Sequence, residues 1–223
     1  MEKILIIIPA YNASSTIPSL IEQIATVVQR ENILVVDDGS SDDTFAIANE
    51  SKVKVLQHKR NKGKGEALLS GFGYALKNGY EAVITMDADL QHDPQFIPDF
   101  LNKFTQTSPD IIIGTRTIEL KTMPFSRWLT NNMTSIIVSV LGGTKVRDSQ
   151  SGYRLISAKV LNKIRLVTKK YDLESELLIK AGRVKFKIDS VFISTLYPGS
   201  KSFINPLVDT KRFIKLMWRS LWW

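Results

Sequence analysis

The sequence has no cysteine and no long hydrophobic run, and each absence excludes a class of protein. Without cysteine, the chain has no disulfide framework, no thiolate metal site and no cysteine nucleophile, and it fits a reducing compartment. Its apolar stretches, such as Ile136 to Leu141, are far shorter than the roughly 18–20 residues that a membrane-spanning helix needs. The chain opens directly into the strand-like run Ile4–Ile8, so we expect no secretory signal.

Negative charge is the scarcer sign in this chain. It carries 30 Lys and Arg against 22 Asp and Glu, a net charge of +8, with an isoelectric point near 9.6. This excess predicts an anionic partner, which could be a nucleotide, a nucleic acid or a phospholipid surface. The length of 223 residues and the hydrophobic content of 43% suit one α/β domain with a full core.

Short runs rich in Ile and Val alternate with helical patterns over the first half of the chain. Runs of this kind predict strands buried on both faces of a mainly parallel sheet. They are Ile4–Ile8, Ile33–Val36, Val53–Gln57, Ala82–Met86 and Ile111–Ile113. Helical spacing is present over 17–28, 43–51, 66–77 and 94–104. The alternation predicts an α/β fold, a Rossmann-like open sheet flanked by helices.

The second half is less regular. The segments 125–141, 158–164 and 173–181 have helical patterns, and 185–196 resembles a strand. No repeat or linker interrupts the chain. We therefore expect one main domain over residues 1–197 and a C-terminal segment over residues 198–223.

The most informative segment follows the buried run Ala82–Met86. Asp87 and Asp89 come where that strand would end, and open parallel sheets bind their ligands at this edge. Carboxylates two residues apart can both bind one hard cation such as Mg²⁺ or Mn²⁺, and Gln91 continues the spacing with a carbonyl oxygen. The alternative is that these acids only decorate a loop or cap the helix after Pro94.

A second acidic pair, Asp37 and Asp38, follows the run Ile33–Val36. An acid just beyond a strand can accept hydrogen bonds from a ribose or a base. The alternative is a turn that leads to a helix cap at Ser41 or Asp42.

A series of short motifs stands in order along the chain. They are Ile8-Pro9-Ala10-Tyr11-Asn12, Val36-Asp37-Asp38-Gly39-Ser40, Asn61-Lys62-Gly63-Lys64-Gly65, Met86-Asp87-Ala88-Asp89-Leu90-Gln91, Gly114-Thr115-Arg116, Asp148-Ser149-Gln150-Ser151-Gly152-Tyr153-Arg154 and Ser200-Lys201. The ordered series resembles the family 2 glycosyltransferases, especially the dolichol- and polyprenyl-phosphate sugar transferases, and covers nearly the whole chain. The resemblance implies a GT-A type fold with an open, mixed, mainly parallel sheet, and a cytoplasmic enzyme held peripherally on a membrane.

The resemblance also implies roles for individual residues. Those that match the nucleoside segments are Pro9, Tyr11, Asn12, Val36, Asp37 and Asp38. Those that match the diphosphate and metal segment are Asp87, Ala88, Asp89 and Gln91, with Mg²⁺ or Mn²⁺ as the cofactor. Lys201 matches a late lysine that closes over the nucleotide sugar. Two positions depart from the family pattern: Ala13 replaces a usual Glu, and Thr195 replaces a frequent Arg.

For the chemistry, the resemblance suggests an inverting displacement at the anomeric carbon of the sugar, with Asp89 and Arg116 at the diphosphate. A lipid phosphate acceptor is already ionised and needs cations to hold it, for which Arg116, Arg127 and Arg154 are candidates. The alternative for Arg127 is an exposed charge on a helix, and for Arg154 a structural ion pair. Lys64 stands among glycines and would add positive charge near phosphate.

Three other functions are compatible with parts of the sequence. A glycosyltransferase that acts on a sugar hydroxyl would need a base, for which Glu176 and Glu174 are the best candidates. Their alternative is the charged face of a helix. A nucleotidyltransferase also uses acidic pairs on such a sheet. A nucleic-acid binder is suggested only by charge and lacks an aromatic RNA-binding signature, so we expect no nucleic-acid partner.

The C-terminal segment predicts a basic amphipathic helix from Pro206 to Trp223. One arc of it is apolar and holds Leu207, Phe213, Ile214, Met217, Trp218, Leu221 and Trp222, while the adjacent arc holds Lys211, Arg212, Lys215 and Arg219. Such a helix suits the headgroup region of an anionic bilayer, where a polyprenyl phosphate would be within reach. The alternative is packing on the core or on a second subunit, as a homo-oligomer.

Overall fold

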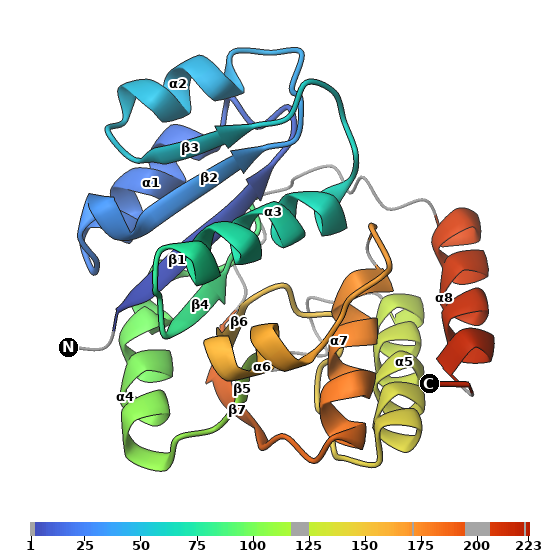
Figure 1. Cartoon of the computed structure of the whole chain (residues 1–223). Coiled ribbons are helices and arrows are strands. Elements are labelled where there is room, and N and C mark those ends of the chain that lie inside the picture. The colour runs from blue at the N-terminus through green and yellow to red at the C-terminus, as the bar shows by residue number, and fades with distance from the viewer. Residues whose placement is uncertain (1–2, 117–124, 171, 195–205, 221) are drawn as a thin grey trace.

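The structure, a computed structural model, describes residues 3–116, 125–170, 172–194, 206–220, 222 and 223. Its centre is a seven-stranded sheet with the order β3-β2-β1-β4-β6-β5-β7 (Figure 1). The strands are β1 (Ile4–Ala10), β2 (Ile33–Asp37), β3 (Lys54–Gln57), β4 (Ala82–Thr85), β5 (Ile111–Arg116), β6 (Arg154–Ser157) and β7 (Ile188–Ile193). The predicted open, mainly parallel sheet is confirmed, and each of the five predicted early strands is present.

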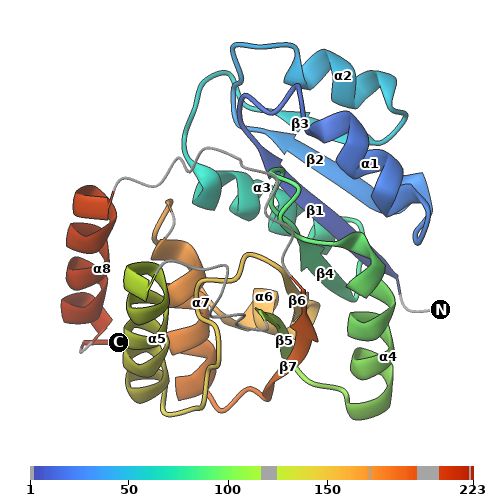
Figure 2. The same cartoon turned by 180° about the vertical axis from the view of Figure 1, so that it is seen from behind.

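Helices cover both faces of this sheet (Figures 1 and 2). On one face lie α1 (Ile17–Ala25), α2 (Thr44–Glu50) and α4 (Ile97–Thr107), and on the other lie α3 (Lys64–Lys77), α6 (Ala158–Lys163) and α7 (Asp172–Arg183). Short 3-10 turns form at Arg30–Asn32 and Pro94–Phe96. Two further helices, α5 (Phe125–Gly142) and α8 (Pro206–Ser220), pack on α7.

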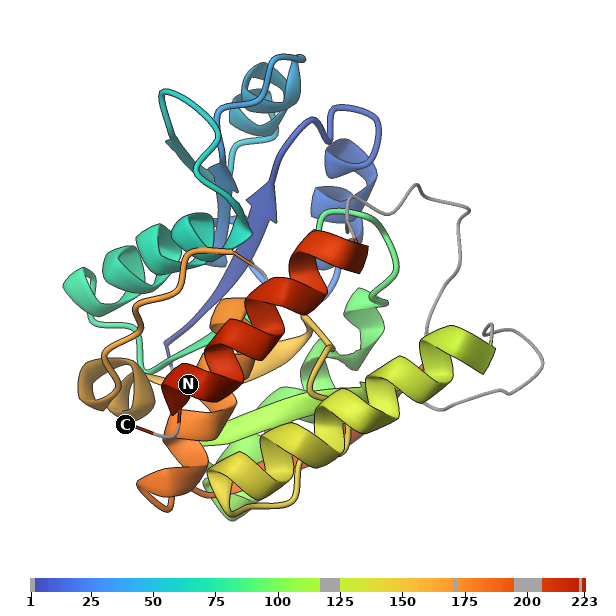
Figure 3. The ribbon, with the colours of Figure 1, turned by 90° about the vertical axis from the view of Figure 1, so that its right-hand side faces the viewer.

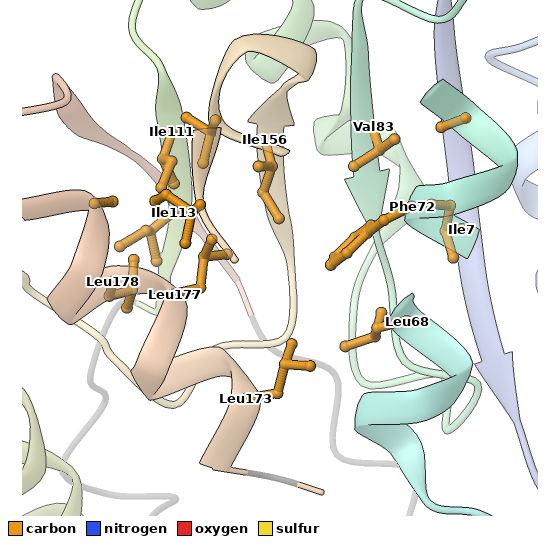
Figure 4. Close-up of a cluster of buried hydrophobic side chains, with 14 of the residues drawn as sticks. Ile7, Leu68, Phe72, Val83, Ile111, Ile113, Ile156, Leu173, Leu177 and Leu178 are labelled. Atoms are coloured by element: carbon orange, nitrogen blue, oxygen red, sulfur yellow. The ribbon is translucent and has the colours of Figure 1, made fainter. Parts of the chain in front are cut away.

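The apolar runs form strands because both of their faces are buried. Along β1, Leu5 and Ile7 point into the core beneath α3, whereas Ile6 and Ile8 point into the core beneath α1. A run that alternates between two cores must be apolar at every position, as the sequence is here. Figure 4 shows the first of these cores, where Phe72 of α3 lies near Val83 of β4.

Strand β6 was not predicted. It runs antiparallel to both β4 and β5 and joins the two parallel parts of the sheet. Its four residues begin with a charged side chain, Arg154, which hides the strand pattern in a single sequence. Because β6 runs in the opposite direction, the loop before it lies at the edge where β4 ends.

The C-terminal helix α8 packs one side against α7. Leu216 is buried and Phe213 packs on the core, and the guanidinium of Arg183 donates to the carbonyl of Ser220. The predicted apolar arc is therefore divided, because Phe213 faces the protein while Ile214 and Trp218 remain exposed. The proposed boundary near residue 198 lies outside the described residues.

Candidate active site

The carboxyl ends of β1, β2 and β4 meet at one edge of the sheet. β1 pairs with β2 on one side and with β4 on the other, and Ala10 is level with Asp37. The loop after β1 and both acidic pairs, Asp37 with Asp38 and Asp87 with Asp89, therefore lie at this edge, as predicted from the sequence.

The loop after β1 forms the outer wall of this site. Tyr11 is exposed, and Asn12 adopts a left-handed conformation with φ of 51°. The Asn12 side-chain oxygen accepts the backbone N–H of Ser41 at 2.9 Å. Pro9 is partly buried at the strand end, whereas the side chain of Val36 lies in the core beneath α3. Of these four predicted residues, Tyr11 offers the most open surface for a nucleoside.

Asp37 is fully buried and braces its own loop. Its carboxylate accepts the backbone N–H and the hydroxyl of Ser40, and it also accepts the amide of Gln57 at 3.2 Å. Asp37 therefore stabilises the turn after β2, which is the alternative to a nucleoside contact given for this acidic pair.

Asp38 is buried and holds the glycine-rich loop before α3. It accepts the backbone N–H groups of Lys62 at 3.0 Å and of Gly63 at 2.6 Å. His58 lies against the same carboxylate, with Nδ1 at 2.7 Å, and its Nε2 is 2.9 Å from the Ser70 hydroxyl. His58 was not predicted from the sequence. It follows the end of β3, whereas Asp38 follows the end of β2, and no local pattern shows that the two lie side by side.

The acidic loop after β4 carries Asp87 and Asp89, with Ala88 between them. Asp89 accepts the backbone N–H of Gln91 at 3.0 Å. His92 is buried, and its Nδ1 accepts the backbone N–H of Asp87 at 3.3 Å. Burial lowers the pKa of His92 to about 4, so the ring is neutral near pH 7 and can accept this hydrogen bond.

Gly152, in the loop before β6, lies directly against Asp87. A Cβ atom added at Gly152 would lie 2.4 Å from Oδ2 of Asp87. The carbonyl of Gly152 accepts the Thr85 hydroxyl at 2.7 Å, which ties this loop to the end of β4. Gly152 belongs to the sequence motif of residues 148–154, but only the fold shows that it lies against Asp87.

Lys64 reaches the acidic loop from the start of α3. Its ammonium is 2.6 Å from Oδ1 of Asp87 and 3.2 Å from Oε1 of Glu174, which comes from α7. Although burial alone would lower it, the two carboxylates raise the pKa of Lys64 above its ordinary value. The lysine is therefore charged throughout the neutral range.

Arg116, at the end of β5, forms a two-point ion pair with Asp148. The two guanidinium–carboxylate distances are 2.7 and 2.9 Å. Although burial opposes ionisation, Arg116 holds the pKa of Asp148 below its ordinary value. This pair fixes the plane of the guanidinium beside the loop that contains Gly152.

Another predicted site residue, Arg154, is fully enclosed by the protein. Arg154 is buried and donates to the backbone carbonyls of Ser149, Ser151 and Glu174 at 2.7, 2.7 and 2.9 Å. Its partners are backbone carbonyls, so the role of Arg154 in this structure is to brace the chain rather than to present an open phosphate contact. The side chain of Arg127 and the whole of Lys201 lie outside the described residues.

Glu176 is fully buried too, and four donors surround its carboxylate. They are the backbone N–H of Val167, the N–H and hydroxyl of Thr168 and the ammonium of Lys180. The arrangement places Glu174 at the site and Glu176 beneath it, because residues two apart on a helix point in different directions.

The acidic loop fits a hard divalent cation. Burial and the repulsion from the neighbouring charge of Asp87 raise the pKa of Asp89 above its ordinary value. A cation relieves this repulsion, and the ammonium of Lys64 already lies on Asp87. Within the described residues, no group of three or more acidic, histidine or cysteine side chains forms a ready metal site. A metal here would therefore need further oxygen ligands, such as a diphosphate supplies.

Comparison with known proteins identifies the family. Residues 5–165 match the model of glycosyl transferase family 2. The chain is 34% identical to a UDP-N-acetylglucosamine–dolichyl-phosphate N-acetylglucosaminyltransferase of Methanococcus voltae, over 96% of this chain and 94% of that protein. It is 32% identical to a polyprenol monophosphomannose synthase of Mycolicibacterium smegmatis, over 74% of this chain and 65% of that protein.

A solved structure confirms the fold. Glucosyl-3-phosphoglycerate synthase from Mycobacterium tuberculosis, crystallised with Mg²⁺ and UDP, superposes with a TM-score of 0.76 at 21% identity. The superposition covers 99% of this chain and 78% of that one. The predicted GT-A type of fold is thus present, and the chain belongs to glycosyl transferase family 2.

Proposed function

We propose that this protein is an inverting, metal-dependent glycosyltransferase that moves a sugar from a nucleotide diphosphate to a polyprenyl or dolichyl phosphate. The main support is the meeting of Asp87, Asp89, Lys64 and Arg116 at one edge of a family 2 fold. The acceptor class is supported by relatives whose names specify dolichyl phosphate and polyprenol.

In this proposal the nucleoside lies against Tyr11 and Asn12, and the diphosphate lies near Asp87 and Asp89. Mg²⁺ or Mn²⁺, held by the two carboxylates and the Gln91 side-chain oxygen, would neutralise the diphosphate and make it a better leaving group. An acceptor phosphate oxygen forms the bond to the anomeric carbon as the bond to the diphosphate oxygen breaks. Attack from the opposite side inverts that carbon.

The cations of the chain hold the two anionic reactants. Arg116 is pre-aligned by Asp148, so its guanidinium loses little freedom when it contacts phosphate. A phosphate acceptor carries its own negative charge and needs no base to remove a proton. The burial of Glu176 agrees with such an acceptor, whereas Glu174 is the carboxylate that could serve a hydroxyl.

A lipid acceptor requires contact with a membrane, and one face of the protein suits it. No helix in the described part of the chain is long and apolar enough to cross a bilayer. Instead, α5 and α8 run side by side over α7 (Figures 1 and 3). On α8, Trp218 is 68% exposed and Trp222 beyond it is 86% exposed, and on α5 Ile136 is 63% and Val140 is 74% exposed.

Helix α8 also carries exposed basic side chains. Lys215 and Arg219 on α8 are exposed, and they match the negative charge of anionic headgroups. We therefore extend the proposed membrane surface from residues 198–223 to the outer face of α5, with residues 1–197 as the catalytic domain. This surface would hold the protein peripherally, on the cytoplasmic side.

The reaction is tested with Mg²⁺ or Mn²⁺, a panel of UDP- and GDP-sugars and polyprenyl phosphate. We expect labelled sugar to enter the organic phase. Asp89→Asn should abolish most of this transfer, whereas Asp99→Asn, the same change on the exposed side of α4, should leave it intact. Label that appears only on water-soluble oligosaccharide would contradict the lipid acceptor, and Glu174→Gln would then be expected to abolish activity.

Membrane contact is tested separately by sedimentation with vesicles that contain phosphatidylglycerol. The double variant Trp218→Ser/Val140→Ser should lose most vesicle binding. Phe45→Ser, an exposed apolar residue on the distant α2, is the control. Equal binding by all three proteins would contradict the proposed surface, and a change in oligomeric state on substitution would indicate a second copy as its partner.

A further inference from the structure

Lys64 is the first residue of α3, and the chain on either side of it is fixed. Asp38 accepts the backbone N–H of Gly63 at 2.6 Å. Gly65 lies so close to the 169–170 segment that an added Cβ would be 2.4 Å from the carbonyl carbon of Lys169. The backbone of Lys64 is therefore held in place, while its long side chain keeps several rotatable bonds.

The ammonium of Lys64 lies between two carboxylates of different roles. Asp87, at 2.6 Å, belongs to the acidic loop, whereas Glu174, at 3.2 Å, projects from α7. A divalent cation on Asp87 would lie close to the ammonium. Two cations on the same carboxylate repel each other strongly in a partly buried site. Glu174 lets the ammonium withdraw from Asp87 without losing its ion pair.

We propose that Lys64 is an internal counter-cation, which neutralises Asp87 in the nucleotide-free protein and moves toward Glu174 when the metal and the diphosphate bind. This inference rests on the metal site of the proposed function. Lys64 then weakens metal binding by the empty protein and favours metal that arrives with a nucleotide. Binding of the metal and binding of the nucleotide become cooperative, because the metal displaces the ammonium from Asp87 and the anionic diphosphate offsets the repulsion between the two cations.

The test measures Mn²⁺ binding by the full chain, followed by the electron paramagnetic resonance signal of free Mn²⁺, without nucleotide and with UDP or GDP. Lys64→Met keeps the length of the side chain and removes its charge. We expect it to bind Mn²⁺ about tenfold more tightly than the wild type without nucleotide, as loss of one close like charge predicts. The tightening on adding nucleotide should be correspondingly smaller.

The matched control is Lys62→Met, which removes the same charge two residues earlier, where the side chain is exposed. It should bind Mn²⁺ as the wild type does, and thermal unfolding should show all variants folded. In the Lys64→Met background, Glu174→Gln should change Mn²⁺ affinity less than it does alone.

Unchanged or weaker Mn²⁺ binding by Lys64→Met without nucleotide would overturn the inference. Absence of Mn²⁺ binding in every protein would overturn it together with the metal site, while transfer to polyprenyl phosphate is measured independently. Conversely, a tenfold gain in Mn²⁺ affinity alongside a failure to glycosylate any lipid phosphate would overturn only the proposed acceptor.

Discussion

Replacing Gly152 with alanine should disable the acidic loop without unfolding the protein. The added Cβ would lie 2.4 Å from Oδ2, 2.9 Å from Cγ and 3.0 Å from Oδ1 of Asp87. Gly152 does not have a positive φ, so alanine is compatible with its backbone. The clash is therefore with one functional side chain.

The loop around Gly152 has little room to retreat. Its carbonyl is bonded to Thr85 at 2.7 Å, and the next two residues, Tyr153 and Arg154, are buried. The carboxylate of Asp87 must then move by about 1 Å to restore an ordinary contact. A displacement of that size at a reacting centre costs on the order of a hundredfold in rate.

The assay compares initial rates of sugar transfer and Mn²⁺ affinity in Gly152→Ala and the wild type. We expect a rate reduced about a hundredfold and Mn²⁺ binding weakened roughly 10- to 100-fold. Gly73→Ala is the control, because a Cβ at Gly73 meets no atom within 4 Å, and alanine should stabilise α3 by up to about 1 kcal/mol. A Gly152→Ala protein with the rate and metal dependence of the wild type would refute this reasoning.

Three further substitutions separate structural from chemical roles. Arg154→Met should lower the free energy of unfolding in urea by about 3 kcal/mol, because buried carbonyls lose their partners; unchanged stability with impaired transfer would instead indicate a phosphate contact. Glu176→Gln should destabilise the protein at pH 7: hydrogen bonds from Lys180 and Thr168 outweigh burial and lower the pKa of Glu176, so its contribution is present above pH 4.5 and lost as the pH falls. The difference in the free energy of unfolding in urea between the two proteins should therefore be smaller near pH 4 than at pH 7. A difference that stays constant would contradict this account. Burial lowers the pKa of His92 from 6.5 to about 4. Between these values the unfolded chain binds a proton that the folded chain does not, so stability should decline from pH 6.5 toward pH 4. His92→Phe should flatten that decline in thermal unfolding, and a slope identical to that of the wild type would count against this account.

Sequence patterns predicted the early strands and the position of the acidic loop for a clear physical reason. A run such as Ile4–Ile8 must be buried on both faces, and the chain that leaves such a strand must reach the edge of the sheet. The same pattern predicts that Asp87 and Asp89 lie where β4 ends. The family motifs identified the fold and the enzyme class, which sets aside the nucleotidyltransferase and nucleic-acid alternatives.

Other features depend on contacts between distant segments. Arg154 and Glu176 are charged residues that a sequence assigns to a surface or a site, and only packing shows which backbone groups surround them. The same holds for His58 beside Asp38, which are 20 residues apart. The proposed membrane surface on α5 was not predicted either, because the apolar pattern of α5 alone does not show which side faces α7.

The antiparallel strand β6 also determines when the sheet can be completed during synthesis. Among the strands of the described residues, β5 pairs with β6 and β7 and with no other, and both lie later in the chain. As the protein leaves the ribosome, the apolar segment Ile111–Arg116 must wait with open edges until residues 154–157 emerge to bond it to β4. An unpaired apolar strand is prone to join other chains. We therefore expect nascent chains that end between residues 116 and 154 to bind chaperones more strongly than the completed chain.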